Sequence, residues 1–220
     1  MTRPEPGSRT FRQRACATHV RPVIFRLVCI VTVAAIAGCS RRAPELPVLA
    51  TVPPFSLVSS EGSPVSDADL RGTVWIADFI FTQCPGVCPI LSDRMAKLQH
   101  ALRADGHSGV RLVSFTVDPA NDTPEVLRAY AQRFHAEPPA WIFVTGQRRA
   151  LFALIHDGFK LAMAERSPDE ADDGQGLVTH SDRFALVDRQ LRIRGYYRPT
   201  EAESFTQLVR DAAGLAATAD

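Results

Sequence analysis

Apolar residues in this chain occur in two patterns, as short continuous runs and as positions spaced three or four apart. The run at 73–81 is hydrophobic on both faces of a strand, which is typical of a central strand covered on both sides. From Pro89 onward the apolar positions recur at helical spacing, at Leu91, Met95 and Leu98. The pattern predicts a buried strand that leads directly into an amphipathic helix.

The alternation of strands and helices continues toward the C-terminus. The expected elements are a helical turn capped by Ser66, a strand at 110–117, a helix capped by Thr123, a strand at 141–144 with a helix after it, a hairpin of 184–187 and 191–196, and a final helix capped by Thr200 and Glu203. This order predicts an α/β fold, a thioredoxin-like sandwich in which helices flank a central mixed sheet, with an N-terminal extension and a terminal hairpin plus helix.

The N-terminal residues predict a signal peptide of the lipoprotein type over 1–38. Six arginines and one acid accompany an apolar run, 27–37, whose 11 residues fall short of the roughly 18 that a spanning helix needs. The run ends in Ile36-Ala37-Gly38-Cys39, which resembles a bacterial lipobox, so we expect Cys39 to be lipidated. The alternative is an uncleaved N-terminal transmembrane anchor. Either reading places the domain outside the cytoplasm, on the periplasmic side of a bacterial membrane.

The mature chain is expected to be a linker and one domain. Residues 39–54 contain four prolines and little apolar pattern, which predicts a linker between the lipid anchor and a single domain over 55–215. Removal of 1–38 leaves 19 basic and 23 acidic residues, so the net charge changes from +1 to −4. This balance does not indicate nucleic-acid binding.

Two cysteines dominate the candidate chemistry. Cys16 and Cys29 leave with the signal peptide, so Cys84 and Cys88 are the remaining pair once Cys39 carries lipid. They lie where strand meets helix, and a helix N-terminus favours thiolate over thiol. Two thiolates suit Cu(I) and an imidazole can complete the set, whereas a closed zinc site needs four protein ligands. An inert disulfide and metal-free thiol exchange are the alternative uses of the pair.

Four segments carry a family resemblance. Phe81-Thr82-Gln83-Cys84-Pro85-Gly86-Val87-Cys88-Pro89 resembles the metal-binding signature of the Sco/SenC family of copper chaperones. Three further segments agree with that family in order and spacing: Thr116-Val117-Asp118-Pro119-Ala120-Asn121-Asp122-Thr123-Pro124, Trp141-Ile142-Phe143-Val144-Thr145-Gly146 and Thr179-His180-Ser181. The resemblance covers about residues 52–212. One departure is Gly86, where many family members carry an acidic residue between the cysteines.

The resemblance implies a set of roles for single residues. Cys84, Cys88 and His180 would bind copper, as Cu(I), Cu(II) or both, and the two cysteines could form a disulfide. Asp118 would orient a ligand or tune the redox properties of the site. From the residues alone, His180 reads as a surface histidine and Asp118 as a turn-former before Pro119. Asp78, inside the buried strand, receives no role.

The implied function is copper delivery rather than catalysis. A monomer held to the membrane by its lipid would deliver copper to the binuclear copper centre of cytochrome c oxidase. Its partners would be the copper-bearing subunit of the oxidase and a second periplasmic copper chaperone. The alternative is a membrane-tethered thiol-disulfide oxidoreductase, or a protein of redox signalling, in which Cys84 attacks and Cys88 resolves.

Overall fold

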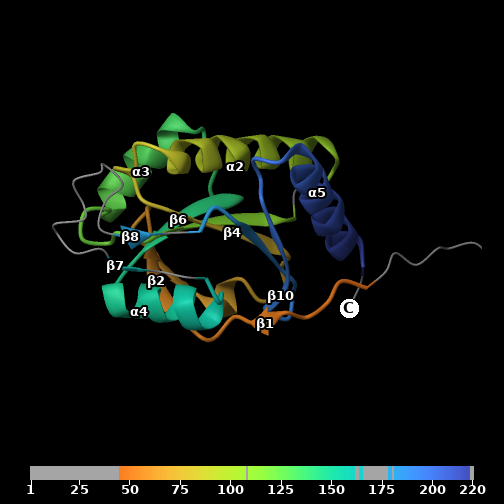
Figure 1. Cartoon of the computed structure of the whole chain (residues 1–220), viewed down its shortest axis with the longest axis horizontal. Helices are drawn as coiled ribbons and strands as arrows, with labels where there is room; N and C mark the ends of the chain where they lie inside the picture. Colours follow the sequence, from red (N-terminus) through yellow and green to blue (C-terminus); the bar gives the residue numbers. More distant parts are fainter. Residues whose placement is uncertain (1–44, 108, 162–163, 166–177, 180, 219–220) are drawn as a thin grey trace, which may run out of the picture. The chain divides into compact units, whose positions relative to one another are not determined.

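A mixed β-sheet forms the centre of the domain. The computed structural model describes residues 45–107, 109–161 and 181–218, and only the backbone of 164–165 and 178–179. Within these ranges the main sheet has the strand order β1-β10-β9-β4-β5-β6-β2-β3 (Figure 1). Its strands are β1 Ala50–Thr51, β2 Ser56–Ser59, β3 Pro64–Ser66, β4 Trp75–Ile80, β5 Arg111–Thr116, β6 Trp141–Thr145, β9 Phe184–Val187 and β10 Arg192–Tyr197. A second small sheet pairs β7, Ala164–Glu165, with β8, Val178–Thr179.

Strand direction and helix placement agree with the predicted class. Strands β4, β5 and β6 are parallel to one another, whereas β9 runs antiparallel to β4. Figure 1 shows α2, α3 and α5 on one face of the sheet and α4 on the other. The helices are α2 Val87–Ala104, α3 Pro124–Arg133, α4 Arg148–Ala153 and α5 Ala202–Ala217, with a 3₁₀ turn at Asp67–Asp69 and a π-helical turn at Leu154–Gly158. The prediction of a mixed sheet flanked by helices is confirmed.

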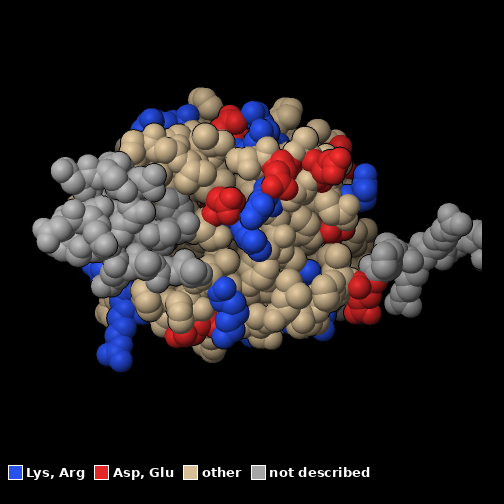
Figure 2. Space-filling model, viewed as in Figure 1, with Lys and Arg blue, Asp and Glu red and all other residues tan. Residues whose placement is uncertain are grey.

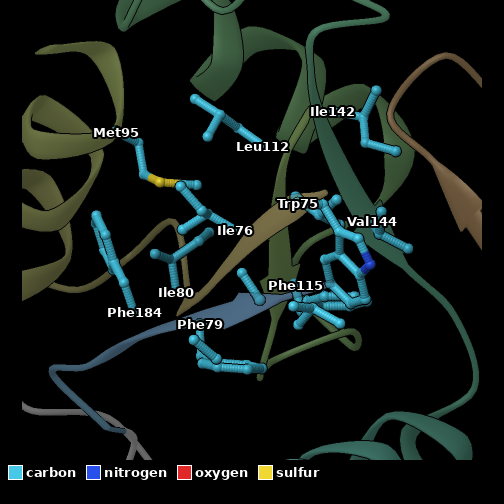
Figure 3. Close-up of a cluster of buried hydrophobic side chains, with 14 of the residues drawn as sticks. Trp75, Ile76, Phe79, Ile80, Met95, Leu112, Phe115, Ile142, Val144 and Phe184 are labelled. Carbon is cyan, nitrogen blue, oxygen red and sulfur yellow. The ribbon is translucent and has the colours of Figure 1, made fainter. Parts of the chain in front are cut away.

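Strand β4 is buried along its whole length, as its apolar sequence predicts. Its side chains alternate between the two faces of the sheet. Figure 3 shows Ile76 beside Met95 of α2. On the opposite face Phe79 stacks on Phe115, with 5.9 Å between ring centroids. Asp78 is in phase with Ile76, so its side chain lies on the face that α2 covers.

Two of the three expected caps are present. The Thr123 hydroxyl oxygen accepts a hydrogen bond from the Val126 backbone N–H at 3.4 Å and begins α3, as predicted. Ser66 caps the 3₁₀ turn together with Asp69, whose carboxylate accepts the Ser66 backbone N–H at 2.8 Å. The cap predicted at Thr200 is wrong, because α5 begins at Ala202 with Glu201 as its N-cap. A turn over 198–201 precedes the helix and moves its start by one residue.

Residues of the predicted linker contact the sheet from Glu45 onward. Strand β1 pairs antiparallel with β10, so part of the 39–54 segment belongs to the sheet. Arg194 of β10 is 3% exposed and donates from Nε to the Pro47 carbonyl at 3.0 Å and from Nη1 to Asp188 at 2.7 Å. The bond to Pro47 anchors the residues just before β1 to β10, the neighbour of the edge strand β1.

Surface charge is mixed on the face that Figure 2 shows. Lysine and arginine lie among aspartate and glutamate there, rather than in a continuous basic stripe. In the part of the chain that the structure describes, no helix is both long enough and apolar enough to span a bilayer.

Candidate metal centre

The two cysteines lie at the junction between β4 and α2. The chain leaves β4, makes a turn in which the Cys84 backbone N–H donates to the Phe81 carbonyl at 3.2 Å, and enters α2 through Gly86. The helix begins at Val87, two residues before the predicted start at Pro89. A proline fits in this first turn because the first backbone N–H groups of a helix have no acceptor within it. Cys88 is therefore inside the helix, and Cys84 precedes it.

The sulfur of Cys84 lies at the start of the helix. The Cys88 backbone N–H points at Cys84 Sγ, with 3.5 Å between nitrogen and sulfur. The structure holds both residues as thiols. Cys84 keeps 8% of its surface exposed, whereas Cys88 is fully buried. The pair is close in space and unequal in access to solvent, and the predicted disulfide between the two residues stays a prediction.

The expectation that the helix N-terminus favours thiolate fails for Cys88. Burial raises the pKa of the Cys88 thiol far above its ordinary value, and the nearby Cys84 and Asp78 add to the rise. A hydrogen bond from the Phe81 backbone opposes it without reversing it. Desolvation of a fully buried sulfur outweighs the partial charge of a helix end, which is worth about 0.3–1 kcal/mol at an exposed site.

Lack of space does not explain why a glycine stands at position 86. A Cβ placed on Gly86 would meet no atom within 4 Å, so the space beside the cysteines could hold a longer side chain. Pro85 and Gly86 are both exposed. An acidic residue at this position, as the family resemblance leads one to expect, would therefore meet no steric obstacle at its Cβ.

A buried polar group lies behind the cysteines. Asp78 is fully buried, and neither carboxylate oxygen has a hydrogen-bond partner among the described residues. Burial raises the pKa of Asp78 to about 7, and its register partner Ser114 only partly offsets this rise. Tyr130 is a second buried polar side chain near Cys88 and Asp78. Its hydroxyl lies 3.1 Å from the Ser92 hydroxyl. Burial raises the pKa of Tyr130, and the nearby Cys88 and Asp78 add to this rise. The sequence shows Asp78 only as a polar interruption, and its burial is the new observation.

Asp118 lies in the loop after β5. It is half-buried, and its carboxylate accepts a hydrogen bond from Asn121 Nδ2 at 2.7 Å. The Asp118 and Asn121 backbones also form a turn, in which the Asn121 N–H donates to the Asp118 carbonyl at 3.2 Å. These bonds agree with its turn-forming reading. Its role toward the cysteines stays a prediction.

Asp122 is the residue that sequence reasoning missed. It is fully buried and accepts hydrogen bonds from the loop before Cys84: its Oδ1 lies 2.5 Å from Thr82 Oγ1, and its Oδ2 lies 3.2 Å from the Thr82 backbone nitrogen. Thr116 Oγ1 donates to the same carboxylate at 2.5 Å. Burial raises the pKa of Asp122, while the bonds from Thr116 and Thr82 oppose the rise. The sequence feature that could have indicated this role is the presence of a second acid four residues after Asp118.

Some predicted site residues lie outside the described residues. These are His180 and Cys39, so the structure tests neither the third ligand nor the lipid site. The chain from Ser181 leads into β9, which pairs antiparallel with β4. The first residue of β9, Phe184, therefore lies near the end of β4 that leads into the cysteine loop. The described ranges hold no group of three His, Cys, Asp or Glu side chains able to bind a metal ion. The remaining described histidines, His100, His107, His135 and His156, are exposed or half-exposed, as expected.

Comparison with known proteins decides the family. The family model described as SCO1/SenC matches residues 44–215. The chain belongs to the SCO1/SenC family. A SCO1/SenC family lipoprotein from Bacillus anthracis is 32% identical with a TM-score of 0.69, and the match covers 77% of this chain and 97% of that one.

Two further solved structures are similar. BsSco, described as a member of the Sco family of cytochrome c oxidase assembly proteins with a disulfide switch, is 30% identical over 80% of this chain and 99% of its own, with a TM-score of 0.68. ScoI from Arabidopsis thaliana, solved with copper bound, is 25% identical over 74% of this chain and 98% of its own, with a TM-score of 0.64. The predicted thioredoxin-like fold is confirmed, and Cys84, Cys88, Asp118 and His180 all fall within the matched SCO1/SenC region.

Proposed function

We propose that this SCO1/SenC protein is a metallochaperone that binds copper through Cys84, Cys88 and His180 and delivers it to the binuclear copper centre of cytochrome c oxidase. The observation that carries the proposal is the contact of Cys84 Sγ with the Cys88 backbone at the start of α2, which holds two soft sulfur ligands side by side. The copper in ScoI and the oxidase-assembly description of BsSco support the choice of cargo and acceptor.

The chemistry of transfer follows from the two thiols. Copper bound by both sulfurs displaces their protons, because thiolates and not thiols are the ligands. Cys84 and Cys88, both buried in the metal-free protein, would supply the two thiolates. Thiolates of an acceptor then replace the ligands one at a time, with His180 as the ligand that leaves most readily. Copper moves with no net oxidation or reduction of the protein.

A second candidate function is reduction of the cysteines of the acceptor. The position of Cys84 before the helix, with 8% of its surface exposed against none for Cys88, favours it, since one attacking and one resolving thiol is the arrangement that disulfide exchange needs. Cys84 thiolate attacks an acceptor disulfide and releases one acceptor thiol. Cys88 then attacks the Cys84 sulfur, which releases the second acceptor thiol and leaves a Cys84–Cys88 disulfide. Two electrons pass to the acceptor.

The His180→Ala variant tests the three-ligand site. We expect it to weaken Cu(I) binding in competition with a chelator and to change the thiolate-to-Cu(II) absorption, while the control variant His156→Ala, at an exposed histidine, changes neither. Unchanged affinity and absorption in His180→Ala would refute the role of His180. Reduction of an acceptor disulfide by metal-free protein, at the rate of copper-loaded protein, would favour the second function.

The proposal includes the N-terminal segments that lie outside the described residues. A signal peptide over 1–38 and a lipid at Cys39 would hold the domain on the periplasmic side of the membrane, and the Bacillus anthracis relative described as a lipoprotein supports this arrangement. Because β1 belongs to the sheet, the free linker of the proposal is shorter than 39–54. A Cys39→Ala variant should lose fatty-acid labelling in cells. Retention of the label would refute the lipid site.

A further inference from the structure

The buried carboxylate of Asp122 joins two loops of the candidate metal centre. One is the loop after β4, which carries Cys84, and the other is the loop after β5, which carries Asp118. The residues that Asp122 bonds, Thr82 and Thr116, lie just after β4 and at the end of β5. Thr82 and Asp122 are 40 positions apart in sequence, so the contact exists only in the folded domain.

The donors around the carboxylate form one consistent pattern. The Thr82 hydroxyl and backbone N–H both donate to Asp122, and so does the Thr116 hydroxyl. The Thr116 oxygen in turn accepts the Asp118 backbone N–H at 2.9 Å. The Asp122 backbone N–H donates to the Asp118 carbonyl at 2.9 Å. Hydrogen bonds to a carboxylate are stronger than neutral ones, so a buried acid holds these donors more firmly than an amide would.

Thr82 lies two residues before Cys84, between bonds that hold the chain on either side of it, and these include one from the Phe81 backbone to Cys88. Ahead of it, the Val117 backbone N–H donates to the Ile80 carbonyl at 2.8 Å and closes the β4–β5 ladder. After it come the turn from Phe81 to Cys84 and the contact of Cys84 with Cys88. The bonds to Asp122 therefore help to fix the point from which the chain reaches Cys84.

We infer that Asp122 is a positioning residue of the cysteine pair, which holds the Thr82–Cys84 segment so that Cys84 Sγ stays at the start of α2 within reach of Cys88. The inference rests on the proposed function of this pair. In physical terms, Asp122 raises the effective concentration of the Cys84 sulfur near the Cys88 sulfur. Both a disulfide and a shared Cu(I) ion need the two sulfurs together, so loosening the segment weakens both.

The test compares Asp122→Ala with a matched control, Asp188→Ala. Asp188 is also a buried aspartate, 3% exposed, and accepts bonds from the Gln190 and Arg192 backbones and from Arg192 and Arg194 side chains. It follows Val187, the residue that pairs with Trp75 at the opposite end of β4 from the cysteine loop. The control therefore loses a comparable set of buried bonds away from Cys84.

Two properties of the protein are measured, with thermal denaturation alongside. One is the dithiol–disulfide equilibrium of Cys84 and Cys88 in the metal-free protein, set by redox buffers, and the other is Cu(I) affinity in competition with a chelator. In Asp122→Ala we expect the disulfide to become about tenfold easier to reduce, a shift of about 30 mV, and Cu(I) to bind about tenfold more weakly. In Asp188→Ala we expect a lower melting temperature with both properties within about twofold of wild type.

Thr82→Val keeps the test decisive should Asp122→Ala fail to fold. This variant removes one of the hydroxyl donors and leaves the backbone N–H, so both properties should change in the same direction by about threefold. Asp122→Asn, which keeps an acceptor oxygen, should restore part of the loss seen in Asp122→Ala. Wild-type values in folded Asp122→Ala or in Thr82→Val, or equal changes in Asp188→Ala, would overturn the positioning role.

Failure of the proposed function would look different. In that case Cys84→Ser and Cys88→Ser would bind Cu(I) no more weakly than the wild-type protein does. The wild-type cysteines would also form no disulfide in redox buffers. Wild-type binding together with unaffected Asp122 variants overturns the inference alone.

Discussion

Replacement of Asp78 by asparagine should remove a pH dependence from the stability of the domain. Asp78 is fully buried without a hydrogen-bond partner among the described residues, and burial raises its pKa from 3.8 to about 7. Between these two values the folded protein binds a proton that the unfolded chain has released. The free energy of unfolding therefore falls as pH rises through this window, and the stabilising effect of the bound proton is lost above pH 7.

The size of the effect follows from the two pKa values. A difference of about three pKa units corresponds to an order of 4 kcal/mol across the whole window, at about 1.4 kcal/mol per unit. Between about pH 5 and pH 8 the change is about 2.5 kcal/mol, because part of the window lies below pH 5. Burial raises the pKa of Cys88 and of Tyr130 as well, so neither neighbour gains a charge over this range.

Urea denaturation of the reduced, metal-free protein at about pH 5, 6, 7 and 8 measures this change. Asp78→Asn should be similar to wild type at pH 5 and more stable by about 2.5 kcal/mol at pH 8, since asparagine is a neutral group of similar shape. Asp93→Asn, which removes a half-exposed carboxylate that pairs with Lys97 on α2, should keep the wild-type pH dependence. A stability difference between Asp78→Asn and wild type that is the same at both ends of the pH range would refute the reasoning.

Two further changes test other contacts. Arg194→Ala removes the bond to the Pro47 carbonyl and leaves Asp188 without one of its buried partners. The free energy of unfolding, measured by urea denaturation, should fall by about 3–5 kcal/mol, and proteolysis before β1 should become faster. Protease resistance equal to that of wild type would contradict the anchoring role. Tyr130→Phe removes the contact with Ser92 and should cost about 1 kcal/mol in thermal denaturation. The matched variant Tyr196→Phe also loses a hydroxyl bond, to the Phe159 carbonyl, and should leave Cu(I) affinity unchanged. A loss of Cu(I) affinity in Tyr130→Phe alone would show that its hydroxyl does more than stabilise the fold.

Local sequence patterns predicted the elements that carry the cysteines. The apolar run that forms β4 is buried throughout, and Thr123 caps α3 as its position before Pro124 indicated. Both features depend on neighbours in sequence, which is why they can be read from the chain. The start of α5 was misplaced by one residue, because the preceding turn over 198–201 decides where the helix begins.

Contacts between distant residues could not be predicted in the same way. The pairing of Ala50 with Ile193, which brings part of the predicted linker into the sheet, joins opposite ends of the domain sequence. The bonds from Thr82 to Asp122 join two loops, and a sequence pattern indicates only the types of residue that could form them. The pKa of Cys88 depends on how deeply its sulfur lies, and a helix N-terminus indicates the opposite direction.

The unequal burial of the two cysteines has a consequence for the order of ligand exchange. Cys88 is fully buried in α2, whereas Cys84 is 8% exposed beside the exposed Pro85 and Gly86, so an acceptor thiolate has more access to Cys84. In the proposed transfer His180 leaves first, and we expect the acceptor to displace Cys84 before Cys88. Protonation of the Cys88 thiol, which burial favours, then hinders the return of copper to the emptied site. In the proposed transfer, the proton that burial favours on the Cys88 thiol competes with copper for the sulfur, which lowers the affinity that an acceptor must overcome.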